Sequence, residues 1–251
     1  MPSTLQGLTR LLLPAECLLC HSLLTARDAD RIVCPVCRHR WRPVQPPWCA
    51  RCGQPEPHFG PCRLCAAWPP ALGTVRSAVW LGDGARDAVH ALKYRALPRI
   101  ADDLADAMVR LLPAPGSDSP PFLVPIPLAP RRQRERGYNQ SEALAAALGR
   151  RWRVPVARGL LERVRETATQ TTLTPETRLA NVAGAFGMSN VEFPMLNDHW
   201  ELDIEHSTFV IVDDVFTTGA TIAEAARALQ QAGARTIHGV TFGRAVIPDF
   251  T

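Results

Sequence analysis

The sequence predicts an α/β fold in which a parallel sheet carries helices on both faces, preceded by a small cysteine-rich segment. Residues 209–212 form an apolar, mostly β-branched run, which is typical of a strand buried on both faces. A helical pattern at 221–229 and a second β-branched run at 236–242 follow, as in a strand–helix–strand unit. All eight cysteines lie before residue 66. We therefore expect a cysteine-rich region, 1–70, and an α/β region, 71–251.

The composition is that of a globular protein rather than a membrane or disordered one. Hydrophobic residues make up 46% and charged residues 21% of the 251 positions, and no apolar run approaches the length of a membrane span. The net charge of +4 permits anionic ligands without requiring nucleic acid. Arg10 and Glu16 argue against a secretion signal, so a cytoplasmic location is expected. Leu5, Leu8 and Leu12 predict a short amphipathic helix.

The cysteines fall into four Cys-x-x-Cys pairs, and two such pairs supply the four thiolates that structural Zn²⁺ prefers. Taken in order, they predict two structural zinc sites, one formed by Cys17, Cys20, Cys34 and Cys37 and the other by Cys49, Cys52, Cys62 and Cys65. The segment has too little core to fold alone, so the metal is expected to stabilise it. Such ribbons bind nucleic acid, bind protein or brace a neighbouring domain.

Other uses of these cysteines are less consistent with the sequence. A redox dithiol needs one reactive pair beside a βαβ unit, and disulfides are rare in the cytoplasm. His21, His39 and His58 are alternative metal ligands, but four thiols for each ion make them unnecessary.

Between the cysteines and residue 125, the hydrophobic pattern predicts a strand at 75–81, helices at 85–96 and 100–111, and a short buried strand at 122–125. The segment from Ala66 to Gly73 contains two adjacent prolines and is expected to be a linker. Lys93 is the only lysine, and exposure statistics favour a solvated position for it.

A basic segment follows the strand at 122–125 and predicts a cationic loop bounded by proline and glycine; its arginines are Arg131, Arg132, Arg134 and Arg136. Ligands of open parallel sheets bind beyond the carboxyl ends of the strands, and arginine contacts phosphate oxygens in pairs. Pyrophosphate or a nucleic-acid backbone is therefore the expected partner, and a solvated basic loop is the alternative. Asn139 and Glu142 predict a capping box at the next helix.

Two later segments show no clear periodicity. The polar stretch before Thr174-Pro175 is expected to be mobile and to close over a reacting sugar, with a helix starting at the proline. Ser189 to Ser207 is expected to be an elaborated loop.

The strand at 209–212 ends in two carboxylates and a hydroxyl-rich loop that leads into a helix. Asp213 and Asp214 can accept hydrogen bonds from a vicinal diol and can hold Mg²⁺. The first amides of a helix attract a phosphate, and three threonine hydroxyls stand beside them, those of Thr217, Thr218 and Thr221. Phosphate and diol are the two ends of a ribose 5-phosphate. The alternative is that the acids merely end a strand and cap a helix.

This segment resembles the signature of type I phosphoribosyltransferases, and nearly the whole chain resembles the ComF family, which includes proteins of DNA uptake. The ComF resemblance rests on the cysteine pairs, Leu92-Lys93-Tyr94-Arg95, Pro125-Ile126-Pro127, Arg131-Arg132, Arg136 to Ser141, Arg165 with Thr167, Gln170 and Leu173, Arg178 with Asn181, and the acidic signature. The long segment from Ser189 to Ser207 departs from the family pattern.

The resemblance implies a type I phosphoribosyltransferase-like domain that binds phosphoribosyl pyrophosphate with Mg²⁺. The implied catalytic acids are Asp213 and Asp214. The implied ligand-binding residues are these two acids with Thr217, Thr218, Gly219, Ala220, Thr221, Arg131, Arg132 and Arg136. Residues 165–181 would take the flexible-loop position of such enzymes. The implied biology is DNA uptake and competence, or nucleotide metabolism.

Three functions compete at this point. The first is a Mg²⁺-dependent phosphoribosyltransferase or a close relative. The second is a non-catalytic accessory factor that binds single-stranded DNA through arginines and aromatic residues such as Trp41, Trp48 and Tyr138, alone or with other DNA-uptake proteins. The third is a zinc-stabilised interaction module with a vestigial sugar-phosphate site.

Overall fold

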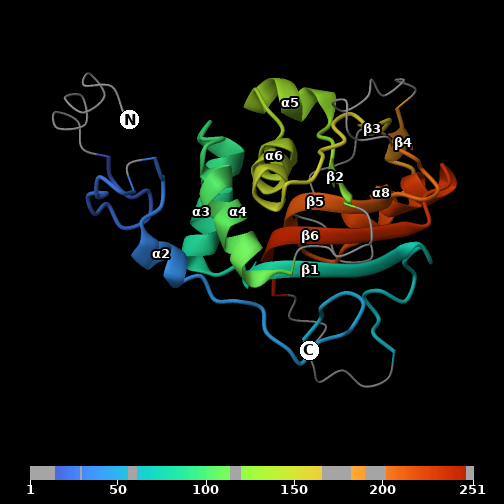
Figure 1. The fold of residues 1–251 in the computed structure, drawn as a ribbon, viewed down its shortest axis with the longest axis horizontal. Helices are drawn as coiled ribbons and strands as arrows, with labels where there is room; N and C mark the ends of the chain where they lie inside the picture. The colour runs from blue at the N-terminus through green and yellow to red at the C-terminus, as the bar shows by residue number, and fades with distance from the viewer. Residues whose placement is uncertain are drawn as a thin grey trace.

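A computed structural model describes residues 15–28, 30–55, 61–113, 120–165, 182–189 and 202–246. Within them, a four-stranded sheet contains, in order across it, β1 (Leu72–Trp80), β6 (Thr236–Arg244), β5 (Thr208–Phe216) and β2 (Phe122–Pro125) (Figure 1). All its neighbouring strands are parallel, which confirms the predicted α/β architecture. None of the helices in these ranges is both long and apolar enough to cross a membrane.

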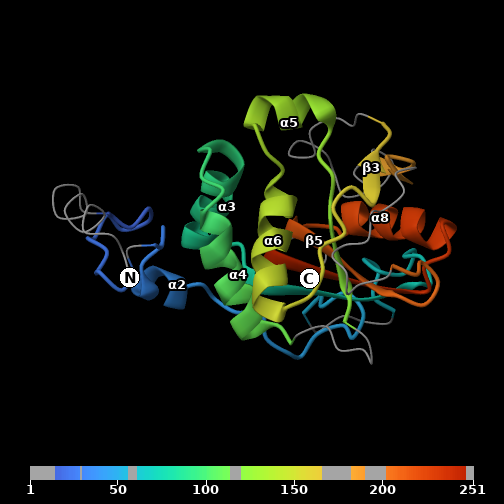
Figure 2. The same ribbon diagram turned by 45° about the horizontal axis from the view of Figure 1, so that its top comes forward.

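Helices cover both faces of the sheet. One face carries α3 (Asp83–Tyr94), α4 (Ile100–Leu111) and α6 (Gln140–Trp152), and the other carries α8 (Ala220–Gln231) (Figure 2). A small antiparallel pair, β3 (Leu161–Arg163) and β4 (Phe186–Met188), lies beside α8. Two short helices, α2 (Pro35–His39) and α5 (Pro130–Arg136), complete the described structure.

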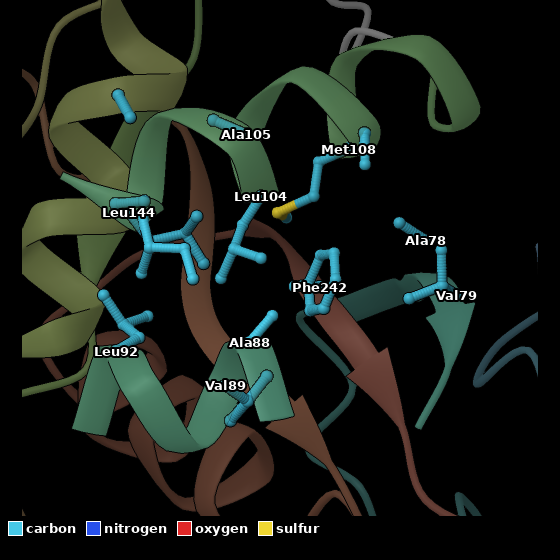
Figure 3. Close-up of a cluster of buried hydrophobic side chains, with 14 of the residues drawn as sticks. Ala78, Val79, Ala88, Val89, Leu92, Leu104, Ala105, Met108, Leu144 and Phe242 are labelled. Carbon is cyan, nitrogen blue, oxygen red and sulfur yellow. The ribbon is translucent and has the colours of Figure 1, made fainter. Parts of the chain in front are cut away.

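The alternation of side chains along β5 divides the core into two clusters. Val210 and Val212 pack toward α3, α4 and α6, whereas Phe209 and Ile211 pack toward α8. Figure 3 shows the first cluster, in which Leu104 and Met108 of α4 approach Phe242 of β6. All of these side chains are fully buried, as expected for a strand with helices on both faces.

The cysteine-rich region is part of both clusters rather than a separate body. Cys17, Cys34 and Cys37 belong to the first cluster, and Cys52 and Cys65 belong to the second. The chain between the two cysteine groups also pairs with the outer edge of β1, because the amide of residue 44 donates to the carbonyl of residue 78 and that of residue 80 donates to residue 42. This pairing covers an edge that would otherwise be open.

Three sequence expectations need correction. The segment 66–73 is not a linker, because β1 begins at Leu72 and Trp68 is buried. The cationic segment is the helix α5 rather than a loop: Pro130 takes its first position, and Gly137 ends it with a φ of 78°. The helix predicted at 85–96 is α3, which begins and ends two residues earlier.

The predicted helix around Leu5 to Leu12, the helix start at Thr174-Pro175 and the polar stretch before it lie outside the described residues. So does most of the predicted loop from Ser189 to Ser207. The other predicted elements are present, with ends that differ by a few residues.

A buried carboxylate on α4 holds the first cysteine group to the sheet domain. Asp103 Oδ2 accepts hydrogen bonds from the amides of Ile32, at 2.8 Å, and Val33, at 3.1 Å. Its other oxygen lies 3.8 Å from Arg31 Nη1 and 3.6 Å from Arg38 Nη1. Asp103 is 1% exposed, so these groups replace its water.

We expect Asp103→Ala to lower the free energy of unfolding by roughly 3 kcal/mol, because two amides lose their acceptor and two nearby guanidinium groups lose a negative charge. Asp102→Ala is the matched control on the same helix. Asp102 pairs with Arg150 and Arg151 at a more exposed position, and its removal should cost under about 1 kcal/mol. Urea unfolding measures the free energy of unfolding of both variants. Equal losses would contradict the role given to Asp103.

Candidate functional site

The carboxyl ends of β5 and β2 open into a cavity of about 610 Å³. Its charged and hydroxyl-bearing lining residues are Lys93, Tyr94, Arg132, Glu135, Arg136, Arg163, Asp213, Asp214, Thr217 and Thr221. This is the edge of a parallel sheet at which ligands bind. The structure therefore brings together the predicted acid pair, two of the three predicted threonines and two of the three predicted arginines.

The two acids have different surroundings. Asp213 Oδ1 accepts from the hydroxyl of Ser141 at 3.0 Å and from the amide of Asp214 at 2.9 Å. Asp214 is 3% exposed, and its Oδ2 lies 2.6 Å from Lys93 Nζ. Burial, followed by the neighbouring charge of Asp214, raises the pKa of Asp213 to about 7. Near neutral pH, Asp213 therefore exchanges a proton.

Lys93 corrects the expectation of a solvated lysine. It lies in the last turn of α3, and its ammonium group reaches the end of β5 to pair with Asp214. Burial is the largest single influence and would lower the pKa of Lys93, but the charge and hydrogen bond of Asp214 and the charge of Asp213 together raise it. Lys93 is therefore a fixed positive charge at the cavity wall. Exposure statistics could not predict this, because the partner lies far away in the sequence.

Two hydrogen bonds fix α6 so that Ser141 meets the acid pair. Asn139 is the N-cap of α6, and its side chain accepts from the amide of Ser141 at 2.9 Å. The amide nitrogen of the same side chain donates to the carbonyl of Ile126, just beyond β2, at 2.9 Å. The cap predicted at this helix thus also ties it to the neighbouring strand end.

The threonine loop, residues 217–221, joins β5 to α8. Gly219 is the N-cap of α8 and has a φ of 77°, a conformation that favours glycine. Thr217 and Thr221 line the cavity, whereas Thr218 and Ala220 are buried and do not. The first turn of α8 is a region of partial positive charge, which suits an anion.

The predicted arginines also differ in whether they line the cavity. Arg136 lies over the ring of Tyr94, 4.8 Å from its centroid, and donates to Gln140 Oε1 at 2.9 Å. Arg131 does not line the cavity, and it pairs with Glu135 on the exposed side of α5 at 2.9 Å. Of the predicted arginines, Arg132 and Arg136 are thus placed for an anion in the cavity.

Arg163 is a cavity residue that the sequence did not indicate. It belongs to β3, and its guanidinium lies 5.1 Å from the ring centroid of Phe186 on β4. Burial, followed by the charge of Arg132, lowers its pKa. No local signal separates Arg163 from other arginines, because the strand pair that positions it is too short to predict.

Each group of four cysteines has the geometry of a metal site. In both groups the four sulfur atoms lie within 4.8 Å of one another. The sulfur atoms of Cys20 and Cys34 are 3.7 Å apart, those of Cys49 and Cys65 are 3.7 Å apart, and those of Cys52 and Cys62 are 3.4 Å apart. Tetrahedral Zn²⁺ with Zn–S bonds of about 2.3 Å places sulfurs about 3.8 Å apart. The two predicted sets therefore fit structural zinc, and we name them site 1 (Cys17, Cys20, Cys34, Cys37) and site 2 (Cys49, Cys52, Cys62, Cys65).

Comparison with known proteins supports both the predicted zinc ribbons and the predicted phosphoribosyltransferase-like domain. Residues 8–66 match the model of the double zinc ribbon domain, and residues 92–245 match that of the phosphoribosyl transferase domain. The DNA utilization protein YhgH of Shigella flexneri is 31% identical over 232 residues, which cover 90% of this chain and 96% of the relative. The competence protein ComFC of Bacillus subtilis strain 168 is 28% identical over 236 residues, 86% of this chain and 89% of the relative. Competence protein F of Haemophilus influenzae is 34% identical over 120 residues, 47% of this chain and 48% of the relative.

We expect protein purified without added zinc to contain about two zinc ions per chain, one for each four-cysteine site. Elemental analysis measures this ratio. Cys20→Ser should remove one ion and Cys62→Ser the other, whereas His39→Ala should remove none. A folded, metal-free protein would contradict the zinc assignment.

The raised pKa of Asp213 predicts a pH dependence of stability. The folded protein disfavours the carboxylate, so stability present below the unfolded pKa of about 3.9 is lost as pH rises through about 7. Asp213→Asn keeps an oxygen to accept from Ser141 but carries no charge. The melting temperature of this variant, relative to the native protein, should therefore rise by several degrees between pH 5 and pH 8. A constant difference across this range would show that Asp213 does not titrate there.

Proposed function

The chain belongs to the ComF family of double zinc ribbon and phosphoribosyl transferase domain proteins, and on this premise we propose that it binds phosphoribosyl pyrophosphate together with Mg²⁺. The observation that carries the proposal is the single cavity in which an acid pair, the threonine loop and a group of cations meet. These groups match, in turn, the diol, the 5-phosphate and the pyrophosphate of that ligand.

The ribose 5-phosphate end fits the junction of β5 and α8. Thr217 and Thr221 offer hydroxyls on the cavity side, and the first turn of α8 offers a positive potential. Asp213 and Asp214 are acceptors for the two ribose hydroxyls. The positive φ of Gly219 lets the chain turn from β5 into α8 at this point.

The pyrophosphate end fits the cations of the cavity. Arg132 and Arg136 of α5, Arg163 of β3 and Lys93 of α3 all line the cavity. These cations come from separate elements that other contacts already hold in place, so they need little reorganisation when charge develops on a leaving pyrophosphate.

The acid pair also fits Mg²⁺. Asp214 already has Lys93 as a counter-ion, whereas the side chain of Asp213 is hydrogen-bonded to a hydroxyl and an amide. A divalent cation would favour the ionised form of Asp213 and would neutralise pyrophosphate oxygens. When bound, Mg²⁺ would supply this charge neutralisation, and the residues of the chain would orient the ribose.

We propose a role linked to DNA uptake or competence, because relatives carry the names DNA utilization protein and competence protein. The same names favour, as a second candidate, an accessory factor that binds single-stranded DNA. The aromatic residues expected for that role are engaged elsewhere: Trp41 is buried against Phe242, Tyr138 donates to the carbonyl of Leu92, and Trp48 lies beneath Arg76. The cavity therefore supports the first candidate better.

Phosphoribosyl pyrophosphate with Mg²⁺ should raise the melting temperature of the native protein by several degrees, since a ligand at about 100 times its Kd adds about 2.7 kcal/mol to stability. The doubly substituted variant Asp213→Asn, Asp214→Asn should show no rise, because it lacks the acceptors for the diol and the metal. Differential scanning fluorimetry measures both shifts.

Asp102→Asn is the matched control, because it removes a carboxylate that does not line the cavity, and it should keep the full rise. Equal shifts in the native and doubly substituted proteins would refute the assignment of the acid pair. A shift produced by a single-stranded oligonucleotide alone, weakening steeply with added salt, would favour the second candidate instead.

A further inference from the structure

The threonine loop rests on a layer of side chains on the side away from the cavity. A Cβ atom built on Gly219 would lie 2.7 Å from Trp68 Cζ2 and 2.8 Å from Phe216 Cε2, so both rings press directly against the backbone of the loop. The rings of Trp68 and Phe216 also meet edge to face, with centroids 6.2 Å apart. The position of the loop therefore depends on what holds these two rings.

Trp68 is held by site 2. It follows the last ligand of that site, and its amide donates to the carbonyl of Cys65 at 3.2 Å. Arg51 stands between the first two ligands, and its guanidinium donates to the carbonyls of Cys65, at 3.0 Å, and of Pro69, at 2.8 Å, on either side of Trp68. Residues of both Cys-x-x-Cys pairs of site 2 thus bind the segment that carries Trp68.

Phe216 is held by site 2 through Arg244. The guanidinium carbon of Arg244 lies 4.4 Å from the ring centroid of Phe216, its neighbour across the β5–β6 pair. Its Nη1 donates to the carbonyl of Cys52 at 3.0 Å, and its Nη2 donates to Gln54 Oε1 at 2.7 Å. Both acceptors belong to the turn that contains the second ligand of site 2.

The burial and charge of Arg244 also fit a metal-loaded site 2. Arg244 is 2% exposed, and a buried cation needs a negative partner. The group that Arg244 contacts belongs to site 2, because its Nη1 donates to the carbonyl of Cys52. Four thiolates around one Zn²⁺ have a net formal charge of about −2, which supplies the partner. Without metal, the turn that carries both acceptors of Arg244 is no longer fixed to the other cysteines of site 2.

We propose that site 2 positions the threonine loop, with Trp68 and Arg244 as positioning residues, and that loss of its metal releases the loop while site 1 has no such effect. Site 1 packs instead against α3 and α4, in the core cluster on the other face of the sheet. The inference concerns the loop to which the proposed function assigns the 5-phosphate. Its test needs no ligand, so it can fail or succeed independently of that assignment.

Hydrogen–deuterium exchange of the amides of residues 217–223 tests the role of Trp68. In Trp68→Ala these amides should exchange at least tenfold faster than in the native protein, and Trp68→Phe should restore most of the protection. Trp41→Ala is the matched control. Trp41 is also buried, also packs edge to face on a phenylalanine, and, like Trp68, has an indole N–H without a hydrogen-bond partner among the described residues. Trp41→Ala should lower the melting temperature comparably but leave exchange of the loop unchanged.

The same measurement on single-site metal variants tests the role of zinc. Cys62→Ser, checked by its zinc content, should accelerate exchange at 217–223 at least tenfold, whereas Cys20→Ser should accelerate exchange in α3 and α4 and spare the loop. Equal loop exchange in the two cysteine variants would overturn the proposal, as would unchanged loop exchange in Trp68→Ala. If Cys62→Ser does not fold, the comparison of Trp68→Ala with Trp41→Ala decides.

Discussion

The fold around the cavity depends on keeping two adjacent carboxylates at the end of a buried strand. Neighbouring carboxylates repel, and burial removes the water that would otherwise screen them. One acid is stabilised by the ammonium group of Lys93 and the other by the hydroxyl of Ser141. These partners come from the last turn of α3 and the first turn of α6. The end of α3 and the start of α6 must therefore both lie beside β5. The bonds from Asn139 to Ile126 and from Tyr138 to Leu92 hold them there.

Features that depend on residues close together in the chain could be predicted from the sequence. The acid pair, the loop with Gly219 and the cysteine pairs each consist of residues close together in the chain, and the structure brings them together as predicted. The partners that are distant in sequence were not predictable: Lys93 lies about 120 positions before Asp214, and only the packing of α3 brings them together. The helical form of the arginine segment had local signals, Pro130 and Gly137, but the run of like charges favoured a loop.

The same distinction between local and distant contacts explains why the packing of the cysteine-rich region was not predicted. Composition separates it from the rest of the chain, which led to the expectation of an appendage joined by a proline-containing linker. In the structure each cysteine group completes a different face of the core, because a sheet with four described strands has two edges and little area to bury. The other edge, β2, is covered in a related way by the chain around Val156, which pairs with Leu123. A boundary in composition therefore does not coincide with a boundary in packing.

The charge pattern of the cavity distinguishes a phosphorylated sugar from a nucleic-acid backbone. A ligand that offers only phosphate oxygens would satisfy Lys93 and the arginines but would bring negative charge toward Asp213 and Asp214. A ribose with two neighbouring hydroxyls offers hydrogen-bond donors to those acids, and its pyrophosphate offers acceptors to the cations. DNA lacks such a pair of free hydroxyls within its chain. Under the proposed function, the two buried acids would therefore select a ligand that has donors at one end and anionic oxygens at the other.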